Sequence, residues 1–355
     1  MSVSGKILFV TGATGLLGNN LTRALLDAGA GQVRALVRSA DKAKAQFAGV
    51  TDPRLSFVIG DMTNVKDFAV ALNGVDILFH TAAYFRDSYT GGSHWAELKR
   101  VNIDGTRDLI VAAYGAGVRR MVHTSSIAVL DGPPGAPVDE TMTRKVANAD
   151  DYYRSKILTD EAVFEALRKY LDFHATMVLP GWMWGPGDAG PTSAGQLARD
   201  FVERKLPGVP PSSFSFVDAR DVAAAQITAA SAGRRGERYL AAGRFMTLAD
   251  LFPMLEAETG VRAPTRKLPL WFLFVIAAFQ ESYARATGGK VLLSWASVKL
   301  LAREAGRTQF DHSKSQRELG LQFRPVEETL RDTLDWMRAQ GLAPPRLSQT
   351  NRSTS

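Results

Sequence analysis

Short apolar runs alternate with segments of helical spacing along the first half of the chain. Six runs have the length and composition of buried parallel strands: residues 7–10, 33–37, 55–59, 77–79, 121–124 and 175–179. Helical spacing lies between them, at residues 17–28, 65–72, 107–116 and 156–170. This alternation predicts an α/β fold, a Rossmann-type doubly wound parallel sheet with right-handed crossovers.

After residue 180 the pattern changes. Gly and Pro cluster at 181–191 and 207–211, a strand and helix return at 216–230, and the chain from about 262 onward is mostly helical. We therefore expect a smaller, mostly helical C-terminal substrate lobe. The predicted divisions are a Rossmann domain at 1–180 with a contribution from about 213–245, a substrate-binding lobe at 181–212 and 246–342, and a flexible tail at 343–355.

The longest apolar stretch covers residues 268–279 and is interrupted by Pro269. It is too short to span a bilayer. We expect a buried helix or a lid over an apolar pocket. A weak contact with a membrane surface stays open as the alternative.

A glycine motif follows the first predicted strand and opens the first predicted helix: Thr11-Gly12-Ala13-Thr14-Gly15-Leu16-Leu17-Gly18. In such a motif the first glycine permits a tight turn, the second lets the backbone approach a pyrophosphate, and the third lets helix and strand pack closely. The helix N-terminus attracts phosphates. This arrangement predicts a dinucleotide site.

The second strand indicates which dinucleotide. An NAD site would place an acidic residue there to bind the ribose 2′-hydroxyl, but Arg38 stands in that place, with Ser39 and Lys42 nearby. A guanidinium can hold a 2′-phosphate, so we favour NADP(H) over NAD(H). Further along, Asp61 could accept a hydrogen bond from the adenine, or Asp61 or Thr63 could cap a helix.

A proton-transfer pair is indicated by Tyr152 and Lys156, which share a face on a helix. A lysine ammonium stabilises phenolate and so lowers the pKa of a tyrosine. Ser126, at the end of the fifth strand, could donate a hydrogen bond to a substrate carbonyl oxygen. Tyr153 is a rival acid or base, but no lysine lies four residues beyond it.

This ordered set of motifs resembles the extended short-chain dehydrogenase/reductase superfamily, also called the NAD-dependent epimerase/dehydratase family. The likeness runs from the glycine motif through residues 80–83, 101–106, 124–126 and 152–156 to Gly185-Pro186-Gly187-Asp188. It covers roughly residues 5–340 and is greatest to the dihydroflavonol 4-reductase and 3β-hydroxysteroid dehydrogenase branch.

The resemblance implies roles for the matching positions. Ser126 would polarise the substrate, Tyr152 would act as general acid or base, and Lys156 would bind the nicotinamide ribose. Asn102 would hold a water that relays protons to Lys156, or it is simply a helix cap. Together with the motif, the expected cofactor contacts are Thr11, Gly12, Thr14, Gly15, Leu16, Leu17, Gly18, Arg38, Lys42, Asp61, Met62, Thr81, Ala82, Ala83, Ser125, Tyr152, Lys156 and Pro180.

Two departures from the family bear on the reaction. Leu179 precedes Pro180 where many sugar-nucleotide members carry arginine, and Ile127-Ala128 follow Ser126 where dehydratases place Asp-Glu. Both departures argue against sugar dehydration and weaken sugar epimerisation.

Loops at the carboxyl ends of the strands should border the nicotinamide with apolar and aromatic side chains, which favour a flat or lipophilic carbonyl compound. The expected substrate contacts are Tyr84, Phe85, Ser126, Ile127, Tyr152, Trp182 and Met183. The predicted activity is that of an NADPH-dependent carbonyl reductase or alcohol dehydrogenase. A sugar-nucleotide epimerase or isomerase is the second interpretation, and a non-catalytic NADP(H) sensor the third.

Composition and charge bear on which classes of binding partner and cofactor are expected. The chain has 355 residues, no cysteine and a net charge of +7. No Lys/Arg block or RNA-binding aromatic motif appears, so dispersed surface charge is favoured over nucleic-acid binding. The scattered histidines indicate no metal site. We expect a cytoplasmic enzyme with a small-molecule carbonyl or alcohol substrate; a homodimer, common in that superfamily, stays open.

Overall fold

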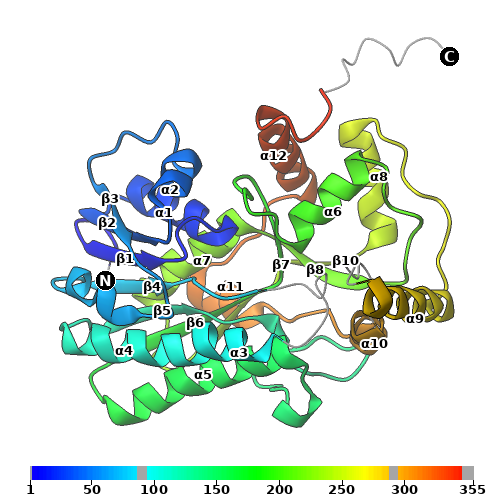
Figure 1. The fold of residues 1–355 in the computed structure, drawn as a ribbon. Helices are drawn as coiled ribbons and strands as arrows, with labels where there is room; N and C mark the ends of the chain where they lie inside the picture. Colours follow the sequence, from blue (N-terminus) through cyan, green and yellow to red (C-terminus); the bar gives the residue numbers. More distant parts are fainter. Residues whose placement is uncertain (1, 86–93, 288–294, 346–355) are drawn as a thin grey trace.

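The computed structural model describes residues 2–85, 94–287 and 295–345 (Figure 1). Its centre is a seven-stranded sheet in the order β3-β2-β1-β4-β5-β6-β9. Every pairing in this sheet is parallel. The strands are β1 Ile7–Thr11, β2 Gln32–Val37, β3 Leu55–Ile59, β4 Ile77–His80, β5 Arg120–Thr124, β6 His174–Pro180 and β9 Arg238–Ala241.

Helices cover both faces of this sheet because successive residues of its strands point to opposite sides. Leu8 and Val10 of β1 belong to one buried cluster, with Leu21 of α1 (Leu16–Asp27) and Val222 of α7 (Ala219–Ala232). Phe9 belongs to the other cluster, which includes side chains of α4 (Gly105–Gly115) and α5 (Asp151–Lys169). The predicted doubly wound sheet is confirmed, with all six predicted strands in it. The burial predicted for residues 55–59 is wrong, because β3 is an edge strand in which Phe57 and Ile59 are 37% and 56% exposed.

The helix predicted at 65–72 is wrong. Two short 3₁₀ turns stand there, η1 Val65–Asp67 and η2 Ala69–Leu72. They are separated at Phe68, whose side chain is buried and stacked on Phe9 with ring centroids 6.0 Å apart. The segment therefore follows the sheet as two 3₁₀ turns with the buried Phe68 between them, and not as one helix.

A second sheet lies beside the first. It contains β7 Trp182–Trp184, β8 Ser213–Asp218 and β10 Arg244–Thr247 in the order β10-β8-β7. The strand that we expected near residue 216 to return to the Rossmann sheet therefore lies in the second sheet, where Phe216 stacks on Trp184. Residues 213–245 were predicted to contribute to the Rossmann domain. Of this segment, α7 packs on the larger sheet and β9 pairs with β6 in it.

The rest of the C-terminal lobe is helical. One buried cluster joins α6 (Ser193–Val202), α8 (Leu248–Thr259) and α12 (Val326–Ala339). A smaller cluster joins α9 (Leu270–Thr287) to α10 (Trp295–Glu304). The remaining helices are α2 Ala40–Gln46, α3 Trp95–Leu98 and α11 Ser313–Leu319. Most of the tail expected at 343–355 lies outside the described residues.

The apolar stretch that was expected to be a buried helix or a lid is only half covered. Leu273 and Ala277 are buried, but Trp271, Val275 and Phe279 are 67%, 56% and 73% exposed. Within the described residues, no helix combines the length and the apolar character needed to cross a membrane.

Candidate active site

The glycine loop between β1 and α1 is fixed by close backbone contacts. Gly12 has a φ of +69°, and a Cβ there would lie 2.8 Å from the Ala82 backbone. A Cβ on Gly18 would lie 2.2 Å from the Gly12 carbonyl oxygen. Gly15 precedes α1, which has no side-chain cap and no acidic residue in its first turn. The first-turn N–H groups of Leu16, Leu17 and Gly18 are thus well suited to bind a phosphate.

The ends of β1 and β4 are joined through Thr11. Its hydroxyl oxygen accepts hydrogen bonds from the backbone N–H groups of Thr81 (3.2 Å) and Ala82 (3.1 Å) and lies 2.7 Å from Nδ1 of His80. Nε2 of His80 lies 2.9 Å from the Thr106 hydroxyl. Burial, and then the charges of its neighbours, hold the pKa of His80 well below its ordinary value. Neutral His80 therefore holds the end of β4 in place, and with it residues 81–83. The sequence did not indicate this role.

Helix α5 presents the predicted acid/base pair in its first two turns. Asp150 starts the helix by accepting a hydrogen bond from the backbone N–H of Tyr153 at 2.7 Å. Tyr152 is half-buried, with the ring of Phe85 edge-on at 4.8 Å. Lys156 is buried and donates from Nζ to the Thr124 carbonyl oxygen at 2.9 Å. Burial lowers the pKa of Lys156 to about 8.

The rival Tyr153 has a different environment. The guanidinium carbon of Arg144 lies 4.8 Å from its ring centroid. Burial, aided by the charge of Glu304, raises the pKa of Tyr153. A phenol held neutral beneath a guanidinium is poorly suited to exchange protons with a substrate.

The two serines after β5 have different partners. The Ser126 oxygen accepts a hydrogen bond from the Ala128 backbone N–H at 3.1 Å, which caps the short turn η5 (Ile127–Val129). Its own hydroxyl hydrogen has no acceptor among the described residues. Ser125, expected beside the nicotinamide, donates to Asp160 at 2.9 Å in the interior. Ser126 is therefore the better placed of the two to meet a substrate oxygen.

A buried ionic network lies next to Lys156 of the predicted acid/base pair. Asp160, one turn beyond Lys156 on α5, accepts hydrogen bonds from Arg238 of β9 at 3.2 and 3.3 Å. Nε2 of His123 is 3.5 Å from the other oxygen of this carboxylate. Despite burial, these partners hold the pKa of Asp160 below its ordinary value. The sequence offered one signal for this network, the four-residue spacing of Lys156 and Asp160.

Asn102 is not a helix cap. It lies inside a continuous helical stretch, in the π-helical turn η4 (Lys99–Asp104) between α3 and α4. Its side-chain oxygen accepts the Tyr84 backbone N–H at 2.6 Å, and its Nδ2 donates to the Tyr84 carbonyl (3.0 Å) and the Ser155 hydroxyl (3.1 Å). Because these contacts occupy its amide, the structure presents Asn102 as a clamp that holds the loop after β4 against α5.

The predicted adenosine contacts lie at the ends of β2 and β3. Arg38 and Lys42 are exposed, and neither side chain hydrogen-bonds to a described residue. The Ser39 hydroxyl is used to cap α2. Asp61 accepts the Thr63 backbone N–H at 2.8 Å, and Met62 is buried. Asp61 thus forms a local turn and does not cap η1, which begins after Asn64.

The predicted substrate contacts are divided between surface and core. Phe85 is exposed, while Tyr84 and Ile127 are half-buried. Trp182 is half-buried and donates from Nε1 to Ser193 at 2.8 Å. Met183, on the opposite face of β7, packs against the large apolar cluster. Pro180 is buried at the end of β6.

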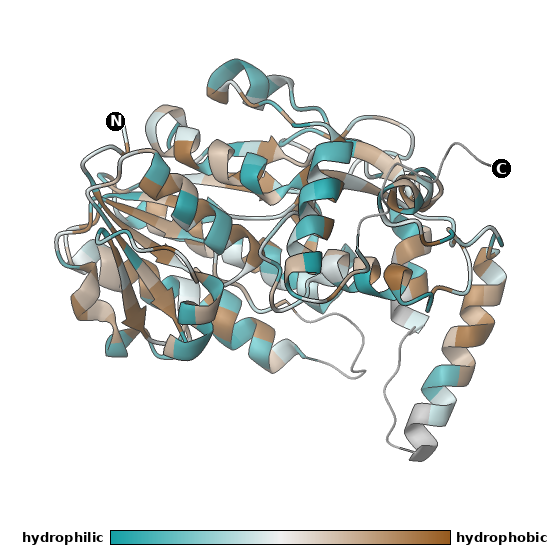
Figure 2. Ribbon diagram, turned by 90° about the horizontal axis from the view of Figure 1, so that it is seen from above, coloured by the Kyte–Doolittle hydropathy of each residue, from teal (hydrophilic) through white to brown (hydrophobic). Residues whose placement is uncertain are grey.

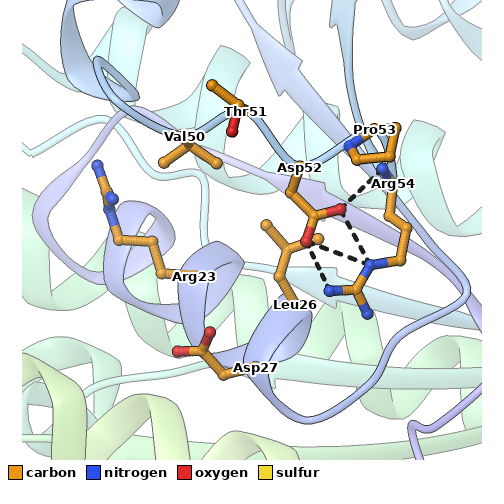
Figure 3. Close-up of a pocket in the computed structure, with 8 residues that line it drawn as sticks. All are labelled: Arg23, Leu26, Asp27, Val50, Thr51, Asp52, Pro53 and Arg54. Carbon is orange, nitrogen blue, oxygen red and sulfur yellow. Dashed lines mark hydrogen bonds and ion pairs between the residues drawn. The ribbon is translucent and has the colours of Figure 1, made fainter.

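A separate surface pocket lies far from these groups in the fold. Figure 3 shows it between the C-terminal half of α1 and the segment before β3, with the ion pair Arg54–Asp52 (2.6 Å) in its wall. Its volume is about 710 Å³. It borders the amino end of the sheet, whereas open parallel sheets bind ligands at the carboxyl ends of their strands.

The parallel sheet and the glycine loop after β1 define a Rossmann-type fold, with Ser126 just beyond β5 and with Tyr152 and Lys156 at the start of α5. Residues 8–242 match the family model described as the NAD dependent epimerase/dehydratase family. The chain therefore belongs to that family, whose members are NAD(P)-dependent oxidoreductases, dehydratases or epimerases. The resemblance found in the sequence motifs is confirmed.

Individual relatives cover almost the whole chain. The chain is 35% identical to sterol demethylase protein B of Methylococcus capsulatus, over 94% of this chain and 98% of that protein. It is 31% identical to a putative dihydroflavonol 4-reductase of Synechocystis, over 94% and 95%. The crystal structure of gox2253 matches with a TM-score of 0.81 at 30% identity, covering 96% of this chain and all of that one.

Proposed function

We propose that the protein is an NADPH-dependent carbonyl reductase, or an alcohol dehydrogenase in the reverse direction, with a lipophilic or aromatic substrate. One observation carries the proposal. Lys156 of α5 donates to the Thr124 carbonyl at the carboxyl end of β5, two residues before Ser126 and one helical turn from Tyr152, and a glycine loop suited to a pyrophosphate follows β1 in the same sheet. This end of a doubly wound sheet is where such folds bind their ligands.

The bound cofactor would supply the hydride, and the chain's own groups handle the proton and the charge. Tyr152 gives its phenolic proton to the carbonyl oxygen as the carbon is reduced. The Ser126 hydroxyl donates a hydrogen bond to the same oxygen and stabilises the negative charge that develops there. The ammonium of Lys156, one turn along α5, stabilises the phenolate that remains.

Positioning residues keep this constellation in place. Lys156 is held by the Thr124 carbonyl, and Asn102 ties the loop that carries Tyr84 and Phe85 to the start of α5. Phe85 in turn packs edge-on against Tyr152. A fixed geometry of this kind is what proton transfer requires, because small displacements of the reacting groups slow it strongly.

The preference for NADPH rests on Arg38. Its exposed guanidinium stands at the end of β2, and no hydrogen bond to a described residue competes with a 2′-phosphate there. Lys42 lies in the first turn of the helix that follows. A lipophilic substrate is supported by Phe85, Trp182 and Ile127, and by relatives that are named for a sterol and a dihydroflavonol.

The test combines binding and turnover. NADPH and NADH are titrated into the purified protein by fluorescence, and NADPH absorbance is then followed with a panel of aromatic and alicyclic ketones and aldehydes. We expect tighter NADPH binding and a rate that falls by about 10²- to 10⁴-fold in Tyr152→Phe. The adjacent Tyr153→Phe is the matched control and should keep most of its activity.

Other outcomes point to the two other interpretations. Conversion of a sugar nucleotide with no net change of cofactor would replace the reductase by an epimerase. Tight cofactor binding with no turnover of either kind of substrate would favour a sensor. Equal loss of activity in both tyrosine variants would remove the distinction that the proposal draws between Tyr152 and Tyr153.

A further inference from the structure

Helix α9 carries a row of exposed apolar side chains. Trp271, Val275 and Phe279 follow one another at four-residue intervals and therefore lie along one side of the helix. They are 67%, 56% and 73% exposed, and the next position in the row, Tyr283, is 60% exposed. Figure 2 shows α9 as a largely apolar helix at the edge of the molecule. So large an apolar surface marks an interaction site more often than a plain solvent face.

The opposite side of α9 already accounts for its place in the fold. Leu273 and Ala277 are buried in a small cluster with Val298 of α10. The Glu281 carboxylate accepts the Trp295 backbone N–H at 2.8 Å. The exposed row is therefore not needed to attach α9 to α10, and its apolar character needs another explanation.

Positive charge borders this row. Residues 262–287 include four basic residues, Arg262, Arg266, Lys267 and Arg285, and a single acidic one. Arg266 and Lys267 are exposed just before α9, and the guanidinium carbon of Arg266 lies 5.7 Å from the Phe272 ring centroid. Aromatic anchors next to basic residues are complementary to an anionic lipid surface, where the rings enter the headgroup region and the cations meet phosphates.

An apolar cavity adjoins the start of the same helix. It has a volume of about 600 Å³ and is lined by Leu268 and Pro269, by residues 209–211 with their two prolines, and by Lys267 as its only charged residue. A cavity of this size is large enough for a drug-sized lipophilic molecule. A lipophilic molecule in this cavity would lie next to α9. The cavity therefore favours a lipid surface over a protein partner as the occupant of the exposed face.

We propose that the exposed face of α9 docks on the surface of an anionic lipid bilayer, with Trp271 and Phe279 as anchors and Arg266 and Lys267 as headgroup contacts. This inference goes beyond the proposed reductase activity and does not depend on it. The docked helix lies in the plane of the interface, which is the geometry expected of a short helix with one apolar side and flanking cations.

The experiment is sedimentation of the full-length protein with phosphatidylglycerol/phosphatidylcholine vesicles. We expect wild type to sediment with the vesicles, and the double variant Trp271→Ser/Phe279→Ser to bind at least about tenfold more weakly. Arg266→Gln/Lys267→Gln should weaken binding by about fivefold for each charge removed, and only when the vesicles are anionic.

The matched control is Val70→Ser/Leu171→Ser, which replaces two apolar side chains that are 76% and 83% exposed elsewhere on the molecule. It should sediment like wild type. Circular dichroism of every variant verifies that each is folded.

Three outcomes would overturn the docking proposal. Wild type could remain in the supernatant with anionic vesicles, or the control could lose binding as strongly as the α9 variant. Light scattering could instead reveal a dimer that Trp271→Ser/Phe279→Ser separates, without any vesicle binding. The face would then join two copies of this chain.

Discussion

The two ends of the proposed cofactor site are constructed in different ways. At the nicotinamide end, between β4, β5 and α5, Lys156, Asp160 and Asn102 are all buried and all hydrogen-bonded to other parts of the chain. At the adenosine end, Arg38 and Lys42 are exposed at the tip of β2 and the start of α2.

The difference follows from what each end has to do. Proton transfer depends on distances and angles, which buried polar networks fix because every unpaired member would be costly. Holding a phosphate depends mainly on charge, which a long and mobile arginine can supply from the surface. Substitutions should therefore have large, structure-wide effects at the first end and small, cofactor-specific effects at the second.

The largest effect is expected at the glycine loop, because both ends of the proposed cofactor site depend on it. In Gly18→Ala the new methyl group would lie 2.2 Å from the Gly12 carbonyl oxygen, so loop and helix must move apart. We expect NADPH to bind about a hundredfold more weakly in fluorescence titration. Gly115→Ala, on α4, meets nothing within 4 Å and is the matched control. Similar affinities in the two variants would contradict the steric argument.

The buried network at the nicotinamide end should be the next most sensitive. Asp160→Asn removes the charge that pairs with Arg238, and breaking a buried pair lowers the free energy of unfolding by about 3 kcal/mol. Urea denaturation measures this change. Asp172→Asn removes the surface partner of Arg119 and should leave the midpoint unchanged. Equal midpoint shifts would mean that burial does not distinguish the two pairs.

The pH dependence of turnover tests the lysine itself. Burial lowers the pKa of Lys156 to about 8, so the ammonium is present below that pH and is lost above it. If this charge supports Tyr152, the reduction rate should fall about tenfold per pH unit on the alkaline side of 8. Lys156→Arg keeps its charge and should move the decline to higher pH. An unchanged profile in this variant would exclude Lys156 as the titrating group.

The smallest effect is expected at the adenosine end. Arg38→Ser should weaken NADPH binding about tenfold and leave NADH binding nearly unchanged, because only the 2′-phosphate contact is lost. The two titrations are run under identical salt, since an exposed contact is screened by ions. Lys66→Ser removes an exposed charge beyond β3 and is the control. A loss of both cofactors in Arg38→Ser would show that Arg38 supports the fold instead.

Most of the larger sheet could be predicted because its strands are short, apolar and bounded by turns. Strands of this kind can be recognised from the local sequence alone. The same is true of the glycine loop and of the Tyr152–Lys156 spacing, where each requirement concerns neighbouring residues. Strand β8 was assigned to the wrong sheet because the hydrophobic pattern of a strand does not indicate which other strand it pairs with.

The supports of the candidate site were not predictable, since they join residues far apart in the chain. Asp160 meets Arg238 across 78 positions, and Asn102 meets Ser155 across 53. The exposure of α9 was missed for a related reason. Its sequence is apolar on several sides, and only the packing of α10 decides which side is covered.

The late position of β9 has a consequence for how the chain assembles during synthesis. A nascent polypeptide leaves the ribosome from its N-terminus, and the seventh strand of the large sheet emerges only after residue 238. Glu318 of α11, which is synthesised later still, accepts hydrogen bonds from Tyr239 of β9 and from Arg234. The larger sheet therefore reaches its full set of strands only after much of the C-terminal lobe has been made, and we expect a gene cut after residue 180 to yield a sheet that lacks β9.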